Sequence, residues 1–460
     1  MNKNVKLFGC TVILLVAISA CETDTLDPDP IPVPVPDPKL LYNEMIKSYN
    51  NEMVLKWDNA ISLAIDNLSP PPPESRAYAM VTLAMHDALN NVVPKFETYA
   101  LDNSRANPEG VSKEEVAKIA DAAVAQAAHD VLVIVAPGWK SSADDLLVEC
   151  LSKMKDSDFK EKGIGIGMEA AASILQKRLK DLRPKFTTYD QGTGPGEYRS
   201  YIPFTLANPP AWPENAVYAP DWGNVVPFGI TSGQQFRPGP PYPINSQEYA
   251  SDYDEVKLLG CNECPNRTQE QLDMGAFFIE NSPSAMNRIA RTFAIEGKFN
   301  GYETARLLAL THMVQADIHI SVFEAKYFYN SWRPITAIRE GENDGNDNTA
   351  GDPNWIIPQR QEVRTTPPTP SYPSSHAANG GAAAELFKLY FGKDKKSFTI
   401  ASISLPETNR SYESFSQLAH DISLSRIYIG YHFRQDIIEG EKMGRLLAAF
   451  VYHNNLRELE

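Results

Sequence analysis

Three short clusters in the last third of the chain combine cations, hydroxyls and imidazoles. They contain, in order, Lys326 and Arg333, then Ser374, Ser375 and His376, then Arg426, His432 and Asp436. Side chains of these types can hold a tetrahedral oxyanion through charge-assisted hydrogen bonds. The clusters include no group of carboxylates of the kind that binds a divalent metal. The sequence therefore predicts an oxyanion site.

The spacing within the first two clusters indicates how their side chains converge. Lys326 and Arg333 are seven residues apart, about two helical turns, so on one helix they would share a face until Pro334 ends it. The segment Ser374–His376 precedes a stretch with helical periodicity. Free N–H groups at a helix N-terminus favour an anion, so we expect the backbone there to contribute to the site.

In the third cluster, Gly430 is expected to break the helix that carries Arg426, and His432 fits the start of the next helix. Asp436, four residues further on, can fix the tautomer of the imidazole and raise its basicity. We therefore predict that His432 is a nucleophile or a ligand. Each of these patterns alone is more often a solvated helix face, a turn or a structural ion pair, and only their joint occurrence in this order is specific.

The three clusters match the signature Lys-x6-Arg-Pro, Pro-Ser-Gly-His, Ser-Arg-x5-His-x3-Asp, and the chain thereby resembles the type 2 phosphatidic acid phosphatase superfamily. The one departure is Ser375, where the pattern has Gly. Within that superfamily, further residues are similar to the bacterial vanadium-dependent haloperoxidases: Trp57, Pro71 to Pro73, Ala79 to Val81, His86, Asp87, Gln235 to Pro238, Asn287 to Ala290, Tyr372 and Pro373. The resemblance spans about residues 45 to 450.

This resemblance implies an all-α fold of paired helical bundles and a vanadate cofactor, for which phosphate would compete. It further implies that the vanadate oxygens are held by Lys326, Arg333, Ser374, Ser375 and Arg426. His432 would bind vanadium axially with support from Asp436, and His376 would transfer protons. The expected reactants are hydrogen peroxide and a halide.

Halide preference depends on Thr369, seven residues before His376. The family's chloroperoxidases carry Phe at this position and its bromoperoxidases carry His. Thr supplies neither an apolar wall nor an imidazole, which favours the more easily oxidised iodide or bromide over chloride.

Two other functions use the same residues. In an acid phosphatase, His432 would attack a phosphate monoester in line and His376 would protonate the leaving alkoxide. A non-enzymatic oxyanion-binding surface lipoprotein would need the cations but not both histidines. The length of the chain and its N-terminal helical half favour the peroxidase.

The N-terminus predicts export and lipid attachment. Residues 1–20 resemble a lipoprotein signal peptide, with Lys3 and Lys6 before an apolar run that is too short to span a membrane. The segment Ile18–Cys21 reads as a lipobox, so Cys21 would anchor the chain to a bacterial membrane, on the periplasmic side or at the cell surface. Residues 21–39 are rich in Asp and Pro and predict a semi-rigid linker.

Residues 40–460 are expected to form the folded domain, because helical periodicity dominates there and alternating strands are scarce. We divide it into an N-terminal helical half (about 40–183), a Pro-rich wrapping segment (about 184–262) and a catalytic half (about 263–460). The formal net charge of −15 argues against nucleic-acid partners. In an exported chain, Cys261 and Cys264 are expected to pair, leaving Cys150 as a buried thiol.

Two further patterns have a structural interpretation. Asp344, Asn346 and Asn348 are spaced as in a calcium loop, but the expected Gly and terminal Glu are missing, so a solvated acidic loop is predicted. His312 and His319 are seven residues apart and could share a helix face, yet no partner cluster accompanies them. We assign them to packing or to support of the site. The remaining histidines, His86, His129, His420 and His453, are expected to be structural.

Overall fold

The computed structural model describes residues 38–66, 69–200, 215–360 and 366–459. The predicted signal peptide, the lipobox and most of the linker lie outside these residues. Within them, no helix has the length and apolar character needed to cross a membrane.

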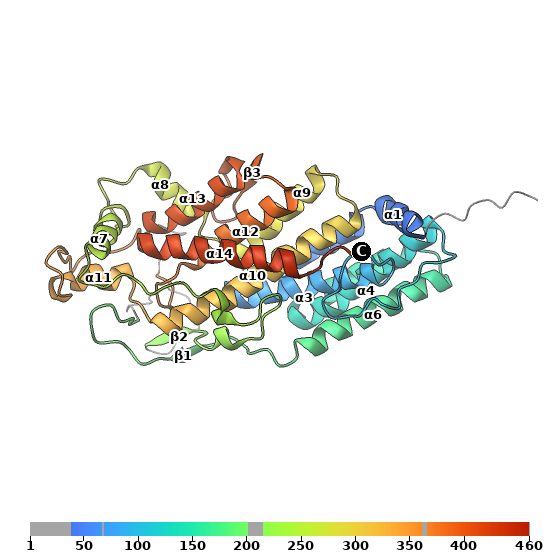
Figure 1. Cartoon of the computed structure of the whole chain (residues 1–460), viewed down its shortest axis with the longest axis horizontal. Coiled ribbons are helices and arrows are strands. Elements are labelled where there is room, and N and C mark those ends of the chain that lie inside the picture. Colours follow the sequence, from blue (N-terminus) through green and yellow to red (C-terminus); the bar gives the residue numbers. More distant parts are fainter. Residues whose placement is uncertain (1–37, 67–68, 201–214, 361–365, 460) are drawn as a thin grey trace, which may run out of the picture.

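Fourteen α-helices build the described part of the chain, and they confirm the predicted all-α class (Figure 1). They are α1 (Pro38–Ser48), α2 (Glu52–Ile65), α3 (Pro71–Asn90), α4 (Lys113–Val135), α5 (Lys140–Ser152), α6 (Asp158–Lys177), α7 (Gln247–Leu259), α8 (Gln269–Phe277), α9 (Ser282–Glu296), α10 (Gly301–Tyr329), α11 (Pro334–Glu340), α12 (Ser375–Phe391), α13 (Phe415–Tyr428) and α14 (Arg434–Asn454).

The helices form two bundles that share helix α10. In one bundle α3 and α6 pack on α4, and in the other α13 and α14 pack on α12 (Figure 1). Helix α10 contacts α3 on one side and α12 on the other. Because it is buried on all sides along most of its length, its apolar residues form no single stripe. Its C-terminal end carries Lys326 to the interior of the second bundle.

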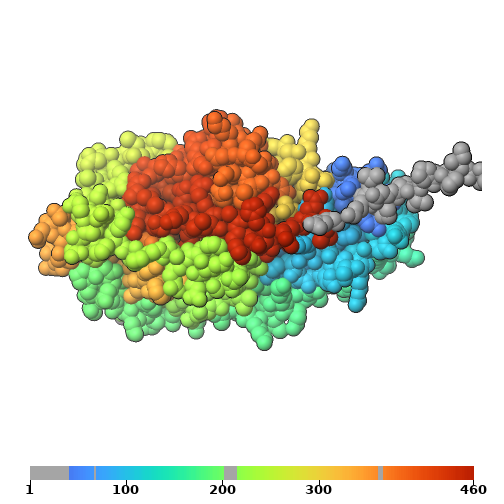
Figure 2. Space-filling model, in the orientation of Figure 1, coloured from blue at the N-terminus to red at the C-terminus, as the bar shows by residue number. Residues whose placement is uncertain are grey.

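The chain from residue 215 to 246, which is part of the predicted wrapping segment, follows α10 along the surface. Figure 2 shows its yellow-green surface beside the red surface of α14. The buried carboxylate of Asp317 on α10 attaches it by accepting hydrogen bonds from the backbone N–H groups of Phe228 (2.6 Å), Gly229 (2.6 Å) and Ile230 (3.0 Å). Asp317 therefore supports the fold rather than a metal.

Strands are few, as predicted, but one hairpin was missed. In the described residues β1 (Phe186–Thr188) pairs with β2 (Ala216–Tyr218), and β3 (Lys395–Ala401) pairs with β4 (Asn409–Ser414), both antiparallel. Apolar spacing predicts one helix from Tyr412 to Tyr428, and its first turn is wrong, because Tyr412 lies in β4 and α13 begins at Phe415. Phe398, Ile400 and Tyr412 alternate with exposed residues and are buried against the second bundle.

The prediction that Lys326 and Arg333 share one helix is also wrong. Helix α10 ends at Tyr329, and Asn330 follows with a left-handed backbone (φ +50°). Arg333 precedes the separate helix α11, whose first residue is Pro334, a position where the missing proline N–H costs nothing. The two cations converge because the chain turns between the helices.

The loop after α11 is only partly solvated. Asp344 and Asn346 are buried, and the Asp344 carboxylate accepts hydrogen bonds from the hydroxyl of Thr349 (2.7 Å) and the N–H of Asn346 (2.8 Å). The sequence prediction of a solvated loop fails at these two positions, since their oxygens stabilise the turn itself. These contacts give no support to a calcium site.

The predicted disulfide between Cys261 and Cys264 is present, and Cys150 is a buried free thiol.

Candidate active site

His432 lies in the loop before α14, and its ring is held at both nitrogens. Nδ1 lies 3.0 Å from Oδ2 of Asp436, and Nε2 lies 3.1 Å from Nη1 of Arg333. Because a guanidinium group can only donate, Nε2 accepts, which assigns the proton of the neutral ring to Nδ1. The imidazole therefore presents an Nε2 lone pair to the cations.

Asp436 is fixed as firmly as the ring that it supports. Its side chain accepts from the N–H of Phe433 at 3.2 Å, which caps the first turn of α14, and from the hydroxyl of Ser371. Its backbone oxygen accepts from the N–H of Ser374 at 2.9 Å. The i, i+4 pair predicted from the sequence thus lies across the helix start, with His432 two residues before α14.

Arg333, in the first cluster, donates hydrogen bonds to the loop before α12. Nε donates to the carbonyl of Thr369 at 2.8 Å, and Nη2 donates to its hydroxyl at 2.9 Å. Nη1 also donates to the carbonyl of Tyr431 at 2.9 Å, next to His432. The planar guanidinium is therefore held in one orientation.

Lys326 reaches the same loop from the last turn of α10. Its Nζ donates to the carbonyls of Pro370 (2.7 Å) and Ser371 (2.8 Å). Two of the three ammonium protons are thus engaged, which leaves one for a ligand.

Arg426, in the last turn of α13, is fully buried and only partly paired. Nε donates to Ser425 Oγ at 2.9 Å and Nη2 to the carbonyl of Gly275 at 3.2 Å. Nη1 has no hydrogen-bond partner among the described residues. A buried guanidinium nitrogen without an acceptor is costly, so this atom is suited to contact a bound anion.

The second cluster starts helix α12, as predicted. Ser374 is its N-cap, and Ser375 and His376 contribute N–H groups that the helix leaves without internal partners. A Cβ added to Gly440 of α14 would lie 2.6 Å from the carbonyl oxygen of Ser374, so the close packing of the two helices requires this glycine. His376 is only partly buried, and its Nε2 lies 3.3 Å from the carbonyl oxygen of Glu280.

Burial and like charges shift the pKa values of the site. Burial lowers the pKa of His432 well below 6.5, and the nearby charges of Arg333 and Lys326 lower it further, so the ring stays neutral. Burial, followed by the charge of Arg333, also lowers the pKa of Lys326. Burial raises the pKa of Asp436 to about 6 against the opposing effect of Ser371 and Lys326.

Three cations that are at most 2% exposed, Lys326, Arg333 and Arg426, therefore act on His432, and one buried carboxylate, that of Asp436, lies beside it. A positive cluster inside a protein of net charge −15 is costly unless an anion completes it.

Ser371 and Thr369 belong to the site, although Ser371 was not among the predicted residues. Its hydroxyl contacts Asp436 and lies 3.3 Å from Nδ1 of His432. Its place five residues before His376 offered only a weak signal, because a serine in a Pro-rich loop is common. The carbonyl contact of Glu280 could not be foreseen, since it depends on the packing of distant segments.

The other histidines on α10 have packing roles, as predicted. His312 donates from Nε2 to Oδ1 of Asn287 at 2.7 Å and stacks on Tyr78, and burial lowers its pKa to about 3. His319 donates from Nδ1 to the carbonyl of Gln315 at 2.7 Å, and its Nε2 lies 3.5 Å from Nδ2 of Asn379 on α12.

The same part of the chain matches a known protein family. Residues 306–460 match the model of the VCPO second helical-bundle domain. Vanadium chloroperoxidase of Curvularia inaequalis is 24% identical over 490 residues, which cover 85% of this chain and 80% of that protein. Over most of its length the chain is thus similar to a vanadium haloperoxidase. The vanadium-dependent bromoperoxidase of Ascophyllum nodosum is 25% identical over 183 residues, or 37% of this chain and 30% of that protein.

Solved structures of vanadium haloperoxidases share the fold. A bacterial vanadium-dependent iodoperoxidase superposes with a TM-score of 0.69 at 23% identity, covering 90% of this chain and 98% of that one. A bacterial vanadium-dependent chloroperoxidase in its holo form gives a TM-score of 0.68 at 18% identity, covering 88% and 99%.

The residues of this site fit the vanadate that the family name implies. The unpaired Nη1 of Arg426 and the remaining proton of Lys326 are donors for an oxyanion. The Nε2 lone pair of His432 is a Lewis base directed toward the neighbouring guanidinium of Arg333.

Proposed function

We propose that this protein is a vanadate-dependent haloperoxidase that oxidises iodide or bromide with hydrogen peroxide. The observation that carries the proposal is the buried neutral His432, whose Nε2 lone pair faces Arg333 while Asp436 accepts from Nδ1. A site that only binds an anion through cations has no use for such a base.

In this proposal Lys326, Arg333 and Arg426 neutralise the oxyanion, and the N–H groups at the start of α12 add dipolar donors. Bound vanadate would activate hydrogen peroxide for attack by the halide. Asp436 holds the His432 ring in the tautomer whose Nε2 can bind the metal centre.

His376 is the proposed proton carrier. Burial, followed by the charge of Arg426, lowers its pKa well below 6.5, so the neutral ring can accept a proton from a reactant. His376 is less deeply buried than His432, which allows exchange of that proton with solvent.

The proposed preference for iodide or bromide depends on Thr369. Both its carbonyl and its hydroxyl accept from Arg333, so the side chain borders the oxyanion site with a short polar group. It supplies neither an aromatic wall nor a second imidazole. An iodoperoxidase among the structures with this fold is consistent with that preference.

The test compares two preparations of one purified sample. The vanadate-loaded protein is assayed for halogenation of a phenolic dye with iodide, bromide and chloride, and the vanadate-free protein is assayed on an aryl phosphate. We expect dye halogenation that depends on vanadate and is faster with iodide or bromide than with chloride. Turnover of the aryl phosphate without vanadate-dependent halogenation would identify a phosphatase instead. Phosphate binding without either activity would identify a binding protein.

We also propose that the mature chain is exported and attached to a bacterial membrane through lipid on Cys21. The support is the apolar run, the lipobox and the Asp/Pro-rich linker of residues 1–39.

A further inference from the structure

The loop that carries His432 is held from outside by the segment between α7 and α8, residues 260–268. This segment contains the Cys261–Cys264 disulfide, and it lies outside the three sequence clusters. It contacts Tyr428 and Gly430, which lie between Arg426 and His432.

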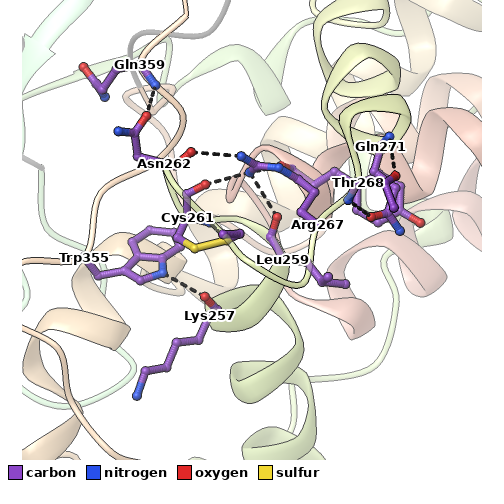
Figure 3. Close-up of a disulfide and its surroundings, with 11 residues drawn as sticks. Lys257, Leu259, Cys261, Asn262, Arg267, Thr268, Gln271, Trp355 and Gln359 are labelled. Carbon is purple, nitrogen blue, oxygen red and sulfur yellow. Dashed lines mark hydrogen bonds between the residues drawn. A yellow bond between two sulfur atoms is a disulfide. The ribbon is translucent and has the colours of Figure 1, made fainter.

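Arg267 makes the central contact between the two segments. Nη1 donates to the carbonyl of Tyr428, the last residue of α13, at 2.9 Å. The same guanidinium donates to the carbonyls of Leu259 (3.1 Å), Cys261 (2.7 Å) and Asn262 (3.0 Å), as Figure 3 shows. All the hydrogen bonds that Arg267 donates within the described residues thus end on backbone oxygens. A cation at this place also complements the C-terminal end of the α13 dipole.

The backbones of the two segments touch beside this contact. A Cβ added to Gly260 would lie 2.6 Å from Cα of Gly430, and one added to Gly430 would lie 2.6 Å from the Gly260 carbonyl oxygen. Gly430 has a φ of +70°, which redirects the chain from α13 toward His432. The turn that aims His432 is therefore fixed by contact with residue 260.

The disulfide fixes the other end of the Arg267 contact. Cys261 supplies one of the four carbonyl acceptors. Leu259 and Asn262, which lie within two residues of it, supply two more. The N–H of Cys261 also donates to Sγ of Cys264 at 2.8 Å. Closing this short turn limits the positions that the carbonyls can adopt, and so limits the orientation of Arg267.

We propose that Arg267, held by the disulfide-closed turn, is a positioning residue that sets the oxyanion affinity of the site through the Tyr428–His432 loop. The proposal rests on the proposed function only in taking Arg426 and His432 as oxyanion-binding groups. Arg267 itself touches no ligand. When the residues that support a site are lost, a displacement of its side chains by about 1 Å is enough to weaken ligand binding strongly.

The experiment measures the dissociation constant of inorganic phosphate by calorimetry for the wild type, Arg267→Met and Arg306→Met. Arg306 is the matched control, because it also donates to a backbone carbonyl, that of Leu456 at 2.8 Å, in a region outside the site. We expect Arg267→Met to raise the dissociation constant about tenfold and Arg306→Met to leave it within twofold of wild type, even where both lower the melting temperature. Arg267→Lys, which keeps one donor, should fall between Arg267→Met and wild type.

The wild-type protein treated with a phosphine reductant provides a second route if Arg267→Met does not fold. Opening the Cys261–Cys264 turn should weaken phosphate binding severalfold, and reoxidation should restore it. An unchanged dissociation constant in folded Arg267→Met, or in the reduced wild type where that variant does not fold, would overturn the positioning role. Failure of the untreated wild type to bind phosphate or vanadate would instead contradict the proposed oxyanion site itself.

Discussion

Nη1 of Arg333 lies 3.1 Å from Nε2 of His432, so a buried guanidinium donates to the lone pair of a buried imidazole. The contact assigns the tautomer of His432 and places its basic nitrogen beside a cation. An oxyanion that accepts from Nη1 of Arg333 would replace Nε2 of His432 as its acceptor and so free the Nε2 lone pair.

Removal of a buried site cation should weaken oxyanion binding. Each of Arg333→Ala and Arg426→Ala deletes a charge-assisted contact worth about 1.5 to 3 kcal/mol, which corresponds to roughly a 10- to 150-fold increase in dissociation constant. Phosphate calorimetry measures this directly. Arg445→Ala is the control, because Arg445 forms its ion pair with Glu441 on the same face of α14, outside the site. Equal losses in all three variants would indicate general destabilisation.

Asp436→Asn should change the pH dependence of stability. Burial raises the pKa of Asp436 from 3.8 to about 6, so between these pH values the folded protein holds a proton that the unfolded chain has released. The Asp436 contribution to the free energy of unfolding therefore falls as pH rises through this window. Urea unfolding at pH 4, 5, 6 and 7 should show the variant gaining stability relative to wild type as pH increases. A difference that does not vary with pH would contradict the shift.

Ser371→Ala should raise the pH range over which Asp436 releases its proton in the folded protein. The hydroxyl of Ser371 donates to the Asp436 carboxylate and lowers its pKa against the effect of burial. Without that hydrogen bond, the carboxyl should release its proton at a higher pH than in wild type. The pH at which the stability curve flattens measures the change, with Ser416→Ala as a surface control because Ser416 contacts Asp394 away from the site. A midpoint at or below the wild-type value would be inconsistent with the assigned contact.

The sequence predicted which residues come together more accurately than the path of the chain between them. The N-terminus of α12 and the His432–Asp436 pair were predicted because each depends on local spacing. The helix shared by Lys326 and Arg333 was wrong, since seven-residue spacing does not reveal that Asn330 takes a left-handed backbone. Ser371 was missed because it contacts His432 only after two distant loops pack together.

In the fold, too, features set by local sequence were easier to predict than features that depend on packing. Local capping signals set some helix boundaries, as in α4, which begins after the capping box of Ser112 and Glu115. The hairpin of β3 and β4 was missed because only three buried side chains mark it. Its strands are stabilised by contact with the second bundle, and a local sequence pattern cannot predict such a contact.

Lipid attachment at Cys21 has a direct measurement. Mass spectrometry of the N-terminal peptide from membranes should show a lipidated Cys21 as the first residue, and Cys21→Ser should release the protein from the membrane fraction. An unmodified Cys21, or a chain that still starts at Met1, would contradict the proposed processing.

The central claim is that His432 completes a vanadate site that oxidises halide. Iodide oxidation by hydrogen peroxide is measured during titration with orthovanadate, for the wild type, His432→Ala and His420→Ala, whose histidine is exposed on α13. We predict saturable, vanadate-dependent turnover in wild type and His420→Ala, with loss of activity in His432→Ala. Full activity of His432→Ala at an unchanged vanadate requirement would contradict the account.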